Sequence, residues 1–140
     1  MKIEKIFFWK GAHSFHRLTY HIVCAPKYRN RILQGKLALR LRELLFQCAE
    51  TNRWFVHDVE AMPDHLHMLI QLPANVTPAK AVNFFKGGSS KVLRKEFPEL
   101  QEFLWGDSFW QDGYFVESVG RLNEKAMREY LKNQRNQENL

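Results

Sequence analysis

An apolar residue occupies every second position from Leu66 to Leu72, which is the pattern of a β-strand whose side chains alternate between two faces. One face carries Leu66, Met68, Ile70 and Leu72, and the other carries His65, His67, Leu69 and Gln71. The first face is apolar throughout, so helices are expected to cover it. The second face presents two imidazoles at positions i and i+2, close enough to share a metal ion.

Three further segments have the character of strands, and they are residues 17–24, 53–61 and 114–119. The first alternates between apolar and polar residues, and the second is rich in aromatic and β-branched residues. Met62-Pro63-Asp64 predicts a tight turn, so the second strand and the histidine strand should form a hairpin.

Helical periodicity marks three segments, which are residues 36–51, a segment that begins at Thr77-Pro78, and residues 123–136. Thr77 is a good N-cap and Pro78 suits the first helical position. The run Gly87-Gly88-Ser89-Ser90 is expected to interrupt the second helix, because each glycine costs a helix about 1 kcal/mol relative to alanine. Residues 98–113 predict an irregular loop.

The predicted order is β-α-β-β-α-β followed by one helix. It indicates an α+β, ferredoxin-like fold with an antiparallel sheet and two helices on one face. The C-terminal helix would then lie on the other face, with the histidines. No repeat or linker divides residues 1–140, so we expect a single domain.

The composition is basic, since 21 Lys and Arg against 15 Asp and Glu give a formal net charge of +6. Such a surface favours an anionic partner, most commonly nucleic acid, although a merely soluble basic protein has the same balance. Cys24 and Cys48 stand in apolar patterns without a Cys-x-x-Cys pair, which indicates buried free thiols and argues against structural zinc. The apolar run 6–9 is too short for a signal peptide or a membrane span, so we expect a cytoplasmic protein with no membrane partner.

The histidine pair is a candidate metal site, because two preset imidazoles leave coordination positions open for a phosphate oxygen. The ordinary alternative is a pair of surface histidines without metal. On the C-terminal helix, Tyr130 and Gln134 are four residues apart and share one face. With His65 and His67 they make a coherent set for metal-assisted attack on a phosphodiester, although Tyr130 alone is as readily a packing residue. Three acidic residues flank the histidine strand and could tune the site, namely Asp58, Glu60 and Asp64.

Basic and aromatic residues are interleaved in segments 7–17 and 26–31, a composition that suits single-stranded nucleic acid. The glycines at 87 and 88, between two lysines, would permit close approach of the backbone to phosphates. Solvated loops and a helix kink are the simpler explanations. The candidate DNA contacts are Arg17, Lys27, Tyr28, Arg29, Arg31, Lys86, Ser89, Ser90 and Lys91.

Several short motifs follow one another along nearly the whole chain. They are residues 14–23, Pro26-Lys27-Tyr28-Arg29, residues 64–70, Lys86-Gly87 with Ser89-Ser90, residues 104–106, Phe109-Trp110, residues 113–116, Val119-Gly120 and residues 129–134. Taken together, they resemble the single-tyrosine HUH transposases, the IS200-like TnpA type carried by very small bacterial insertion sequences. Several motifs in one order are far more specific than any one of them.

The resemblance implies roles for individual residues. His65 and His67 match the metal-binding HUH pair, Tyr130 matches the nucleophile, and Gln134 matches the third metal ligand. It also implies cleavage of single-stranded DNA beside subterminal hairpins, with Mg²⁺ or Mn²⁺ as cofactor. The 5′ ends would be joined to the tyrosine and later rejoined without ATP.

A homodimer with shared active sites is implied as well, in which the tyrosine helix of one subunit completes the site of its partner. The short connection Gly120-Arg121-Leu122 fits that arrangement, because it limits the reach of Tyr130 toward its own histidines. The apolar fourth strand could pair with its symmetry mate at a sheet edge.

Two alternatives stay open at this point. Within the class, a transposase associated with repeated palindromic sequences has its tyrosine in a similar context. From another class, a non-enzymatic RNA-binding module can have the same fold, but its exposed sheet face should then carry aromatic residues for stacking.

Overall fold

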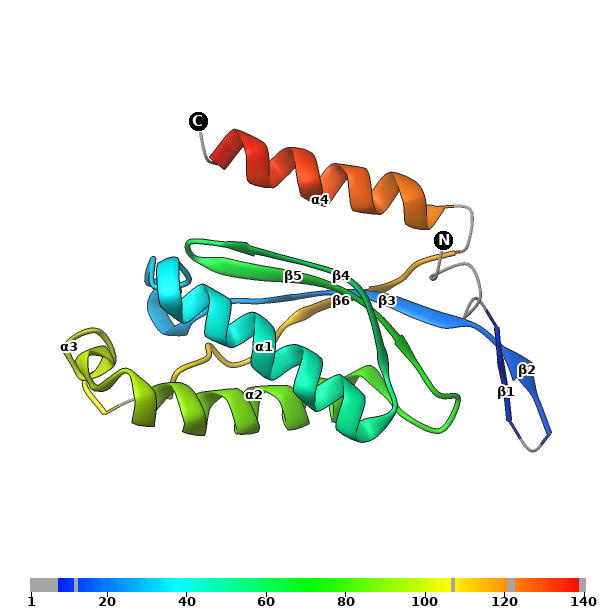
Figure 1. The fold of residues 1–140 in the computed structure, drawn as a ribbon, viewed down its shortest axis with the longest axis horizontal. Helices are drawn as coiled ribbons and strands as arrows, with labels where there is room; N and C mark the ends of the chain where they lie inside the picture. The colour runs from blue at the N-terminus through cyan, green and yellow to red at the C-terminus, as the bar shows by residue number, and fades with distance from the viewer. Residues whose placement is uncertain (1–7, 12, 107, 121–122, 139–140) are drawn as a thin grey trace.

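A four-stranded antiparallel sheet lies at the centre of the computed structural model, which describes residues 8–138 apart from 12, 107 and 121–122. Its strands are, in chain order, β3 (Leu18–Cys24), β4 (Phe55–Met62), β5 (His65–Leu72) and β6 (Phe115–Ser118). Their order in space is β4-β5-β3-β6 (Figure 1). This order, with antiparallel pairing throughout, confirms the predicted ferredoxin-like fold.

Helices α1 (Gly35–Asn52) and α2 (Pro78–Glu96) cover one face of this sheet (Figure 1). The buried positions of α1 are spaced four residues apart and form one stripe, namely Leu37, Leu41, Leu45 and Ala49. They belong to the same core as the apolar face of β5, where Leu66, Met68, Ile70 and Leu72 are at most 2% exposed. Each large side chain removed from water contributes about 1.5–3 kcal/mol, so this layer provides the main stabilisation of the fold.

The start of α2 agrees with the sequence, since Thr77 is the N-cap and its Oγ1 accepts a hydrogen bond from the Lys80 amide. The predicted interruption at residues 87–90 is wrong, because α2 is continuous to Glu96. Phe85 and Leu93, on either side of the glycines, are buried in the core and hold both halves of the helix to the sheet. Burying two such side chains outweighs two glycine penalties of about 1 kcal/mol each.

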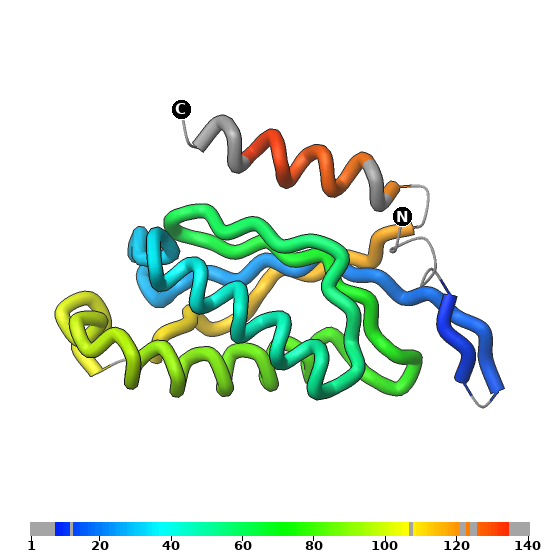
Figure 2. Tube along the Cα trace, viewed as in Figure 1, coloured from blue at the N-terminus to red at the C-terminus, as the bar shows by residue number. Residues whose placement is uncertain are grey.

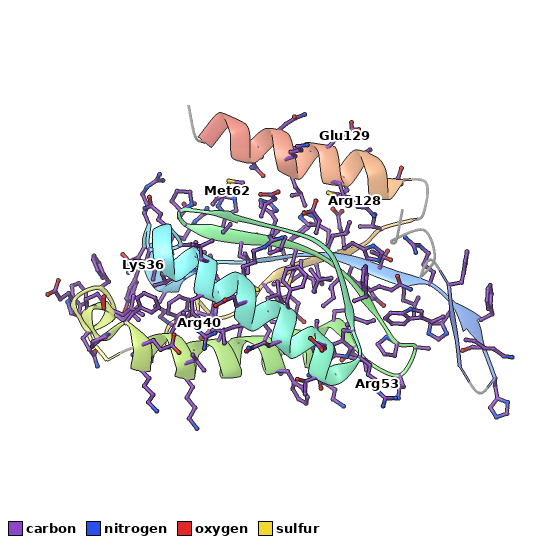
Figure 3. The ribbon with its side chains drawn as sticks, in the orientation of Figure 1. Lys36, Arg40, Arg53, Met62, Arg128 and Glu129 are labelled. Carbon is purple, nitrogen blue, oxygen red and sulfur yellow. The ribbon has the colours of Figure 1, made fainter. Side chains whose placement is uncertain are left out.

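Helix α4 (Glu124–Glu138) lies over the opposite face of the sheet, close to the predicted 123–136 (Figure 1). Among its described side chains only Leu131 is fully buried, and beneath it Met62 and Leu69 are also fully buried on the sheet. Figure 3 shows Met62 between the sheet and α4, with Arg128 on the sheet side of the helix and Glu129 on its outer side. A small apolar contact therefore holds α4 against the sheet.

The path of the chain brings the C-terminal half of α4 toward the turn between β4 and β5 (Figure 2). After β6 the chain turns back, and α4 runs over the sheet (Figure 2). That turn precedes His65, the first residue of β5. The last described turns of α4 therefore lie above the histidine end of β5.

The remaining elements lie at the periphery. A two-stranded hairpin of β1 (Trp9–Lys10) and β2 (Phe15–His16) projects from one end of the molecule (Figure 1). Three short helical turns, η2 (Lys27–Arg29), η3 (Pro98–Leu100) and α3 (Gln101–Leu104), occupy the segments predicted as loops. None of the helices in the described part of the chain combines the length and the apolar character needed to cross a membrane.

Both cysteines are free, as predicted, although Cys48 is only half-buried. Burial raises the pKa of the Cys24 thiol to about 11, against the opposing effect of the Lys86 charge. A thiol with such a pKa is a packing group rather than a reactive one.

Candidate active site

His65 and His67 lie on the same face of β5, under α4, as the alternation predicts. Their ring centroids are 4.8 Å apart and their planes are inclined by 76°. His67 is 6% exposed, whereas His65 lies nearer the surface. They line one cavity of about 580 Å³ together with Arg29, Tyr114 and Gln134.

A chain of polar contacts fixes the ring of His65. Its Nδ1 is 2.8 Å from Oδ1 of Asp64, and Nη2 of Arg29 donates a hydrogen bond of 3.1 Å to Oδ2 of the same carboxylate. Burial acts to raise the pKa of Asp64, but the hydrogen bond from His65 and the charge of Arg29 outweigh it and lower that pKa. An ionised carboxylate on Nδ1 leaves Nε2 of His65 as the atom available for a metal.

The environment of His67 keeps its ring neutral. Burial lowers its pKa to about 4, the neighbouring His65 and His21 rings act in the same direction, and the contact with Gln134 acts against them. Its Nδ1 is 3.0 Å from Nε2 of His21, and Nδ1 of His21 is 3.2 Å from Oε1 of Glu117. A neutral imidazole is the form that binds a metal.

Nε2 of His67 and Oε1 of Gln134 are both buried in this cavity and make no hydrogen bond of good geometry within the described residues, although Gln134 lies close enough to act on the pKa of His67. Leaving a buried polar atom unsatisfied costs about 1–3 kcal/mol, so a native site that does so calls for an explanation. Imidazole nitrogen and amide oxygen are both metal ligands. The donor set therefore fits a divalent cation held by two histidines and one amide, with coordination positions left open.

The described residues contain no group of three or more His, Cys, Asp or Glu side chains placed to hold a metal ion. An amide oxygen such as that of Gln134 is not among these donor types. Closed four-ligand sites are structural, whereas an incomplete protein shell is typical of catalytic metal centres.

Tyr130 lies in an adjacent cavity of about 560 Å³, lined by residues that include His21, Glu117 and Asn123. Its side chain is 55% exposed. Phe115 lines both this cavity and the one that holds the histidines, so the two cavities are neighbours. The i, i+4 spacing of Tyr130 and Gln134 accounts for the arrangement, because it aligns both side chains along one side of α4.

The expected limit on the reach of Tyr130 toward its own histidines stays a prediction. Residues 121 and 122 of the short connection before α4 lie outside the described residues. Within the single chain, Gln134 nevertheless lines the cavity of its own histidines, and α4 covers its own sheet.

The candidate DNA contacts fall into separate places. Lys27, Tyr28 and Arg29 form η2, and Arg29 reaches the histidine cavity. Arg31 is exposed just beyond η2. Arg17 lies toward the other end of β5, where it donates a hydrogen bond of 3.5 Å to Gln71.

The four α2 candidates lie in the helical layer on the far face of the sheet from the histidines (Figure 1). Lys86 Nζ donates to the carbonyls of Gln111 and Gly113, at 2.9 and 2.6 Å. Ser89 is 3% exposed, and its Oγ accepts a hydrogen bond from Nε1 of Trp110. Both side chains have structural partners in this structure, whereas Ser90 is half-buried and Lys91 is exposed.

Three further residues at or near the site were not singled out from the sequence. His21 and Glu117 lie beside His67 only because β3 and β6 pair next to β5, with His21 opposite Glu117 and Val23 opposite His67. Trp105 is 80% exposed with its ring centroid 6.3 Å from that of Tyr28. The sequence places Trp105 in a predicted loop, but it does not reveal that the side chain is exposed and lies close to Tyr28.

Comparison with known proteins gives consistent matches over most of the chain. Residues 14–134 match the family described as "Transposase IS200 like". The ISDra2 transposase TnpA of Deinococcus radiodurans is 32% identical over 133 residues, which is 92% of either protein. The transposase for insertion sequence element IS200 of Salmonella typhimurium is 32% identical over 123 residues, covering 88% of this chain and 80% of that protein.

Solved structures give the same picture of the fold. The crystal structure of a Deinococcus radiodurans R1 protein assigned as a transposase matches with a TM-score of 0.75 and 29% identity, over 90% of this chain and 97% of that one. The REP-associated tyrosine transposase bound to a REP hairpin matches with a TM-score of 0.57 and 13% identity, over 88% of this chain and 68% of that one. The second likeness concerns the fold alone.

Proposed function

The chain belongs to the IS200-like transposases, and from this premise we propose that it cleaves and rejoins single-stranded DNA at insertion-sequence ends through a 5′-phosphotyrosine intermediate. The observation that supports the proposal best is the pair of unsatisfied buried atoms, His67 Nε2 and Gln134 Oε1, in one cavity with His65. The RNA-binding alternative has no support, because α4 covers the sheet face on which such a module would stack bases.

The metal ligands in this proposal are His65, His67 and Gln134, and Mg²⁺ or Mn²⁺ is the cofactor. When bound, the cation supplies charge stabilisation at the oxygens of the scissile phosphate. Asp64 and Arg29 orient His65, and burial keeps His67 neutral and ready to bind. Contacts with Asp64 and His21 hold the rings of His65 and His67 in place, which lowers the cost of assembling the site.

Tyr130 is the proposed nucleophile. Its hydroxyl oxygen forms an ester with the 5′ phosphate, and the bond from phosphorus to the 3′ oxygen of the preceding nucleotide in the same strand breaks. The phenol proton is given up and the departing oxygen takes one up, so the products are a phosphotyrosine and a free 3′-OH. One phosphodiester replaces another, and a second 3′-OH can therefore reverse the step without ATP.

The proposed DNA surface lies at the histidine end of the sheet. Arg29 borders the cavity, Tyr28 and Trp105 expose aromatic faces beside it, and Lys27 and Arg31 add positive charge. Exposed aromatics stack unpaired bases while cations follow the backbone, so this surface suits single-stranded DNA next to a hairpin. The buried Ser89 is not part of the proposed surface.

We test the nucleophile with Tyr130→Phe, using Tyr114→Phe as the matched control because Tyr114 is also exposed and lines the histidine cavity. A labelled, hairpin-bearing oligonucleotide incubated with Mn²⁺ should give a covalent adduct on denaturing gels with the wild type and the control. Tyr130→Phe should give none and should retain its DNA affinity, because it loses one oxygen and little volume. An adduct with Tyr130→Phe would identify another nucleophile.

DNA affinity itself should fall steeply as salt is raised, because basic side chains release counterions from phosphates. Binding of the oligonucleotide is measured over a range of salt concentrations. An affinity independent of salt would contradict the basic surface proposed above.

Two copies are proposed to share their active sites, each tyrosine helix completing the partner's site. The edge strand β6 favours assembly, since Phe115 and Val116 are 51% and 37% exposed on it. Mixing His65→Ala protein with Tyr130→Phe protein under conditions of subunit exchange should restore one working site per heterodimer. Exchange without recovered cleavage would mean that each chain uses its own helix, the arrangement in which Gln134 already lines the cavity.

A further inference from the structure

The β1–β2 hairpin projects from the end of the sheet away from the histidine cavity, and the proposed cleavage site does not use it (Figure 1). In its register Trp9 lies opposite His16, and Lys10 lies opposite Phe15. Side chains alternate along a strand and directly opposite residues share a face, so Trp9 and His16 are on one face. Lys10 and Phe15 are on the other, together with Phe8, whose ring stacks on that of Phe15.

The face with Trp9 and His16 is turned toward the body of the protein. Both residues are only partly exposed, and they line a cavity of about 450 Å³ together with Pro73 and Ala74, which follow β5. The face with the two phenyl rings is therefore the outer face of the hairpin.

The outer face leaves a pair of aromatic rings in water. The ring centroids of Phe8 and Phe15 are 5.0 Å apart, and their planes are inclined by only 11°. Phe15 is 72% exposed and Phe8 is 40% exposed. Because Phe8 covers one side of the Phe15 ring, the exposure of that ring is on its other side. Adjacent exposed apolar groups are typical of an interaction site, whereas single scattered ones are not.

The charge around the rings indicates the kind of partner. No Asp or Glu occurs between residues 5 and 42 of the sequence, and Lys10, directly opposite Phe15, is exposed. An aromatic ring beside a cation suits single-stranded nucleic acid, because an unpaired base stacks on the ring while the cation meets a phosphate. A duplex hides the faces of its bases, and an apolar protein surface would leave the lysine without a role.

The hairpin is joined directly to the sheet that carries the histidines. Strand β2 leads through Arg17 into β3, and Nη1 of Arg17 donates a hydrogen bond of 3.5 Å to Oε1 of Gln71. Gln71 lies on the same face of β5 as His67. From Phe15 to Val23, which pairs with His67, the extended chain covers about 26 Å. A strand bound at the histidines can therefore reach the hairpin with nucleotides several positions away.

We propose that the outer face of this hairpin is a second binding site for single-stranded DNA, where one unpaired base stacks on Phe15 and Lys10 meets a neighbouring phosphate. The site goes beyond the proposed cleavage site, and binding there requires neither the metal nor Tyr130. It holds the strand at a distance from the reacting phosphate.

The test measures binding alone, by fluorescence anisotropy with the whole chain in excess chelator. The probes are labelled hairpin oligonucleotides with unpaired thymine tails at both ends, and in a second set one tail base at a time is replaced by an abasic site. With the wild type, loss of the base that stacks on Phe15 should weaken binding about 5–100-fold. In Phe15→Leu, which keeps an apolar side chain but no ring, loss of the same base should change nothing.

Three further variants separate the ring, the charge and general effects. Phe15→Tyr keeps the ring and should bind every probe as the wild type does. Lys10→Ala should make the plot of log affinity against log salt shallower by about 0.7. Phe84→Ala is the matched control, because Phe84 is 47% exposed with Nζ of Lys80 5.6 Å from its ring centroid, but it lies on α2. It should respond to abasic sites like the wild type.

An equal response to abasic sites in the wild type and in Phe15→Leu would overturn the inference. Equally tight binding of a tail made double-stranded by a complementary oligonucleotide would overturn it too, and an unchanged salt dependence in Lys10→Ala would overturn the phosphate contact. Failure of the proposed function is a separate outcome. If the wild type shows the base contact at Phe15 but forms no covalent adduct with Mn²⁺ present, the cleavage proposal is wrong and the hairpin site stands.

Discussion

The two faces of β5 are formed by the same eight residues, but they differ in polarity and in how closely they are covered. The face toward α1 and α2 is apolar, closely covered and part of the main core. The face toward α4 holds two histidines, and the cavity there contains buried nitrogen and oxygen atoms that make no hydrogen bond of good geometry among the described residues. The first face makes the fold stable, whereas the second carries the side chains that the proposed function assigns to a metal.

His65→Ala should separate the two faces most clearly, because it should remove activity and leave the fold intact. Cleavage of a hairpin-bearing oligonucleotide should be abolished, because one of two preset imidazoles is lost, while circular dichroism should show an intact fold. Excess chelator should have the same effect on the wild type. Full cleavage by the variant, or in chelator, would show that the histidine face does not hold the catalytic metal.

Leu93→Ala tests the core face. Leu93 is fully buried against the sheet, so removing its side chain should lower the free energy of unfolding by about 2–5 kcal/mol. Lys95→Ala, exposed on the same helix, is the control and should change little. Denaturant titration of the two variants measures the difference, and equal stability would mean that the core tolerates the cavity.

Leu131→Ala tests how α4 is held. Leu131 is fully buried, but it belongs to a small contact and a helix can settle into the gap, so a loss of about 2 kcal/mol or less is expected. Hydrogen exchange should increase in α4 and remain slow in β5. Faster exchange throughout the sheet would show that the two faces unfold as one unit.

A further effect concerns the stability of the metal-free protein in acid. Folding lowers the pKa of His67 from an ordinary 6.5 to about 4, so the unfolded chain binds more protons between these values. Stability should therefore fall as pH drops from about 6.5 to about 4. Asp64 adds a further loss below its ordinary pKa of 3.8. Denaturation at several pH values measures the slope, which should be shallower in His67→Gln, and an equal slope would contradict the assignment to His67.

Much of the fold and of the candidate site could be predicted from the spacing of residues within single helices and strands. The alternation from His65 to Leu72 and the capped start at Thr77 are both confirmed by the structure. The i, i+4 pair Tyr130 and Gln134 also lies along one side of α4, next to the sheet. Each of these depends on neighbours within one element, where spacing alone decides which side chains share a face.

Features that depend on pairing between distant segments were not predictable. The contact of His21 with His67 requires a register between β3 and β5, which one residue of slip would abolish. The continuity of α2 through Gly87-Gly88 depends on burial of Phe85 and Leu93, which propensity does not include. Ser89 likewise resembles a surface hydroxyl until Trp110 is seen to donate to it.

The hydrogen bonds of Lys86 connect the helical layer on one face of the sheet with the wall of the histidine cavity. The ammonium group of Lys86 reaches from α2 to two carbonyls of the segment just before β6, and that segment borders the histidine cavity. The strand that it anchors carries Phe115 and Glu117 into the site. A substitution of Lys86, in the helical layer, would therefore remove two hydrogen bonds from the wall of the histidine cavity without touching any candidate ligand.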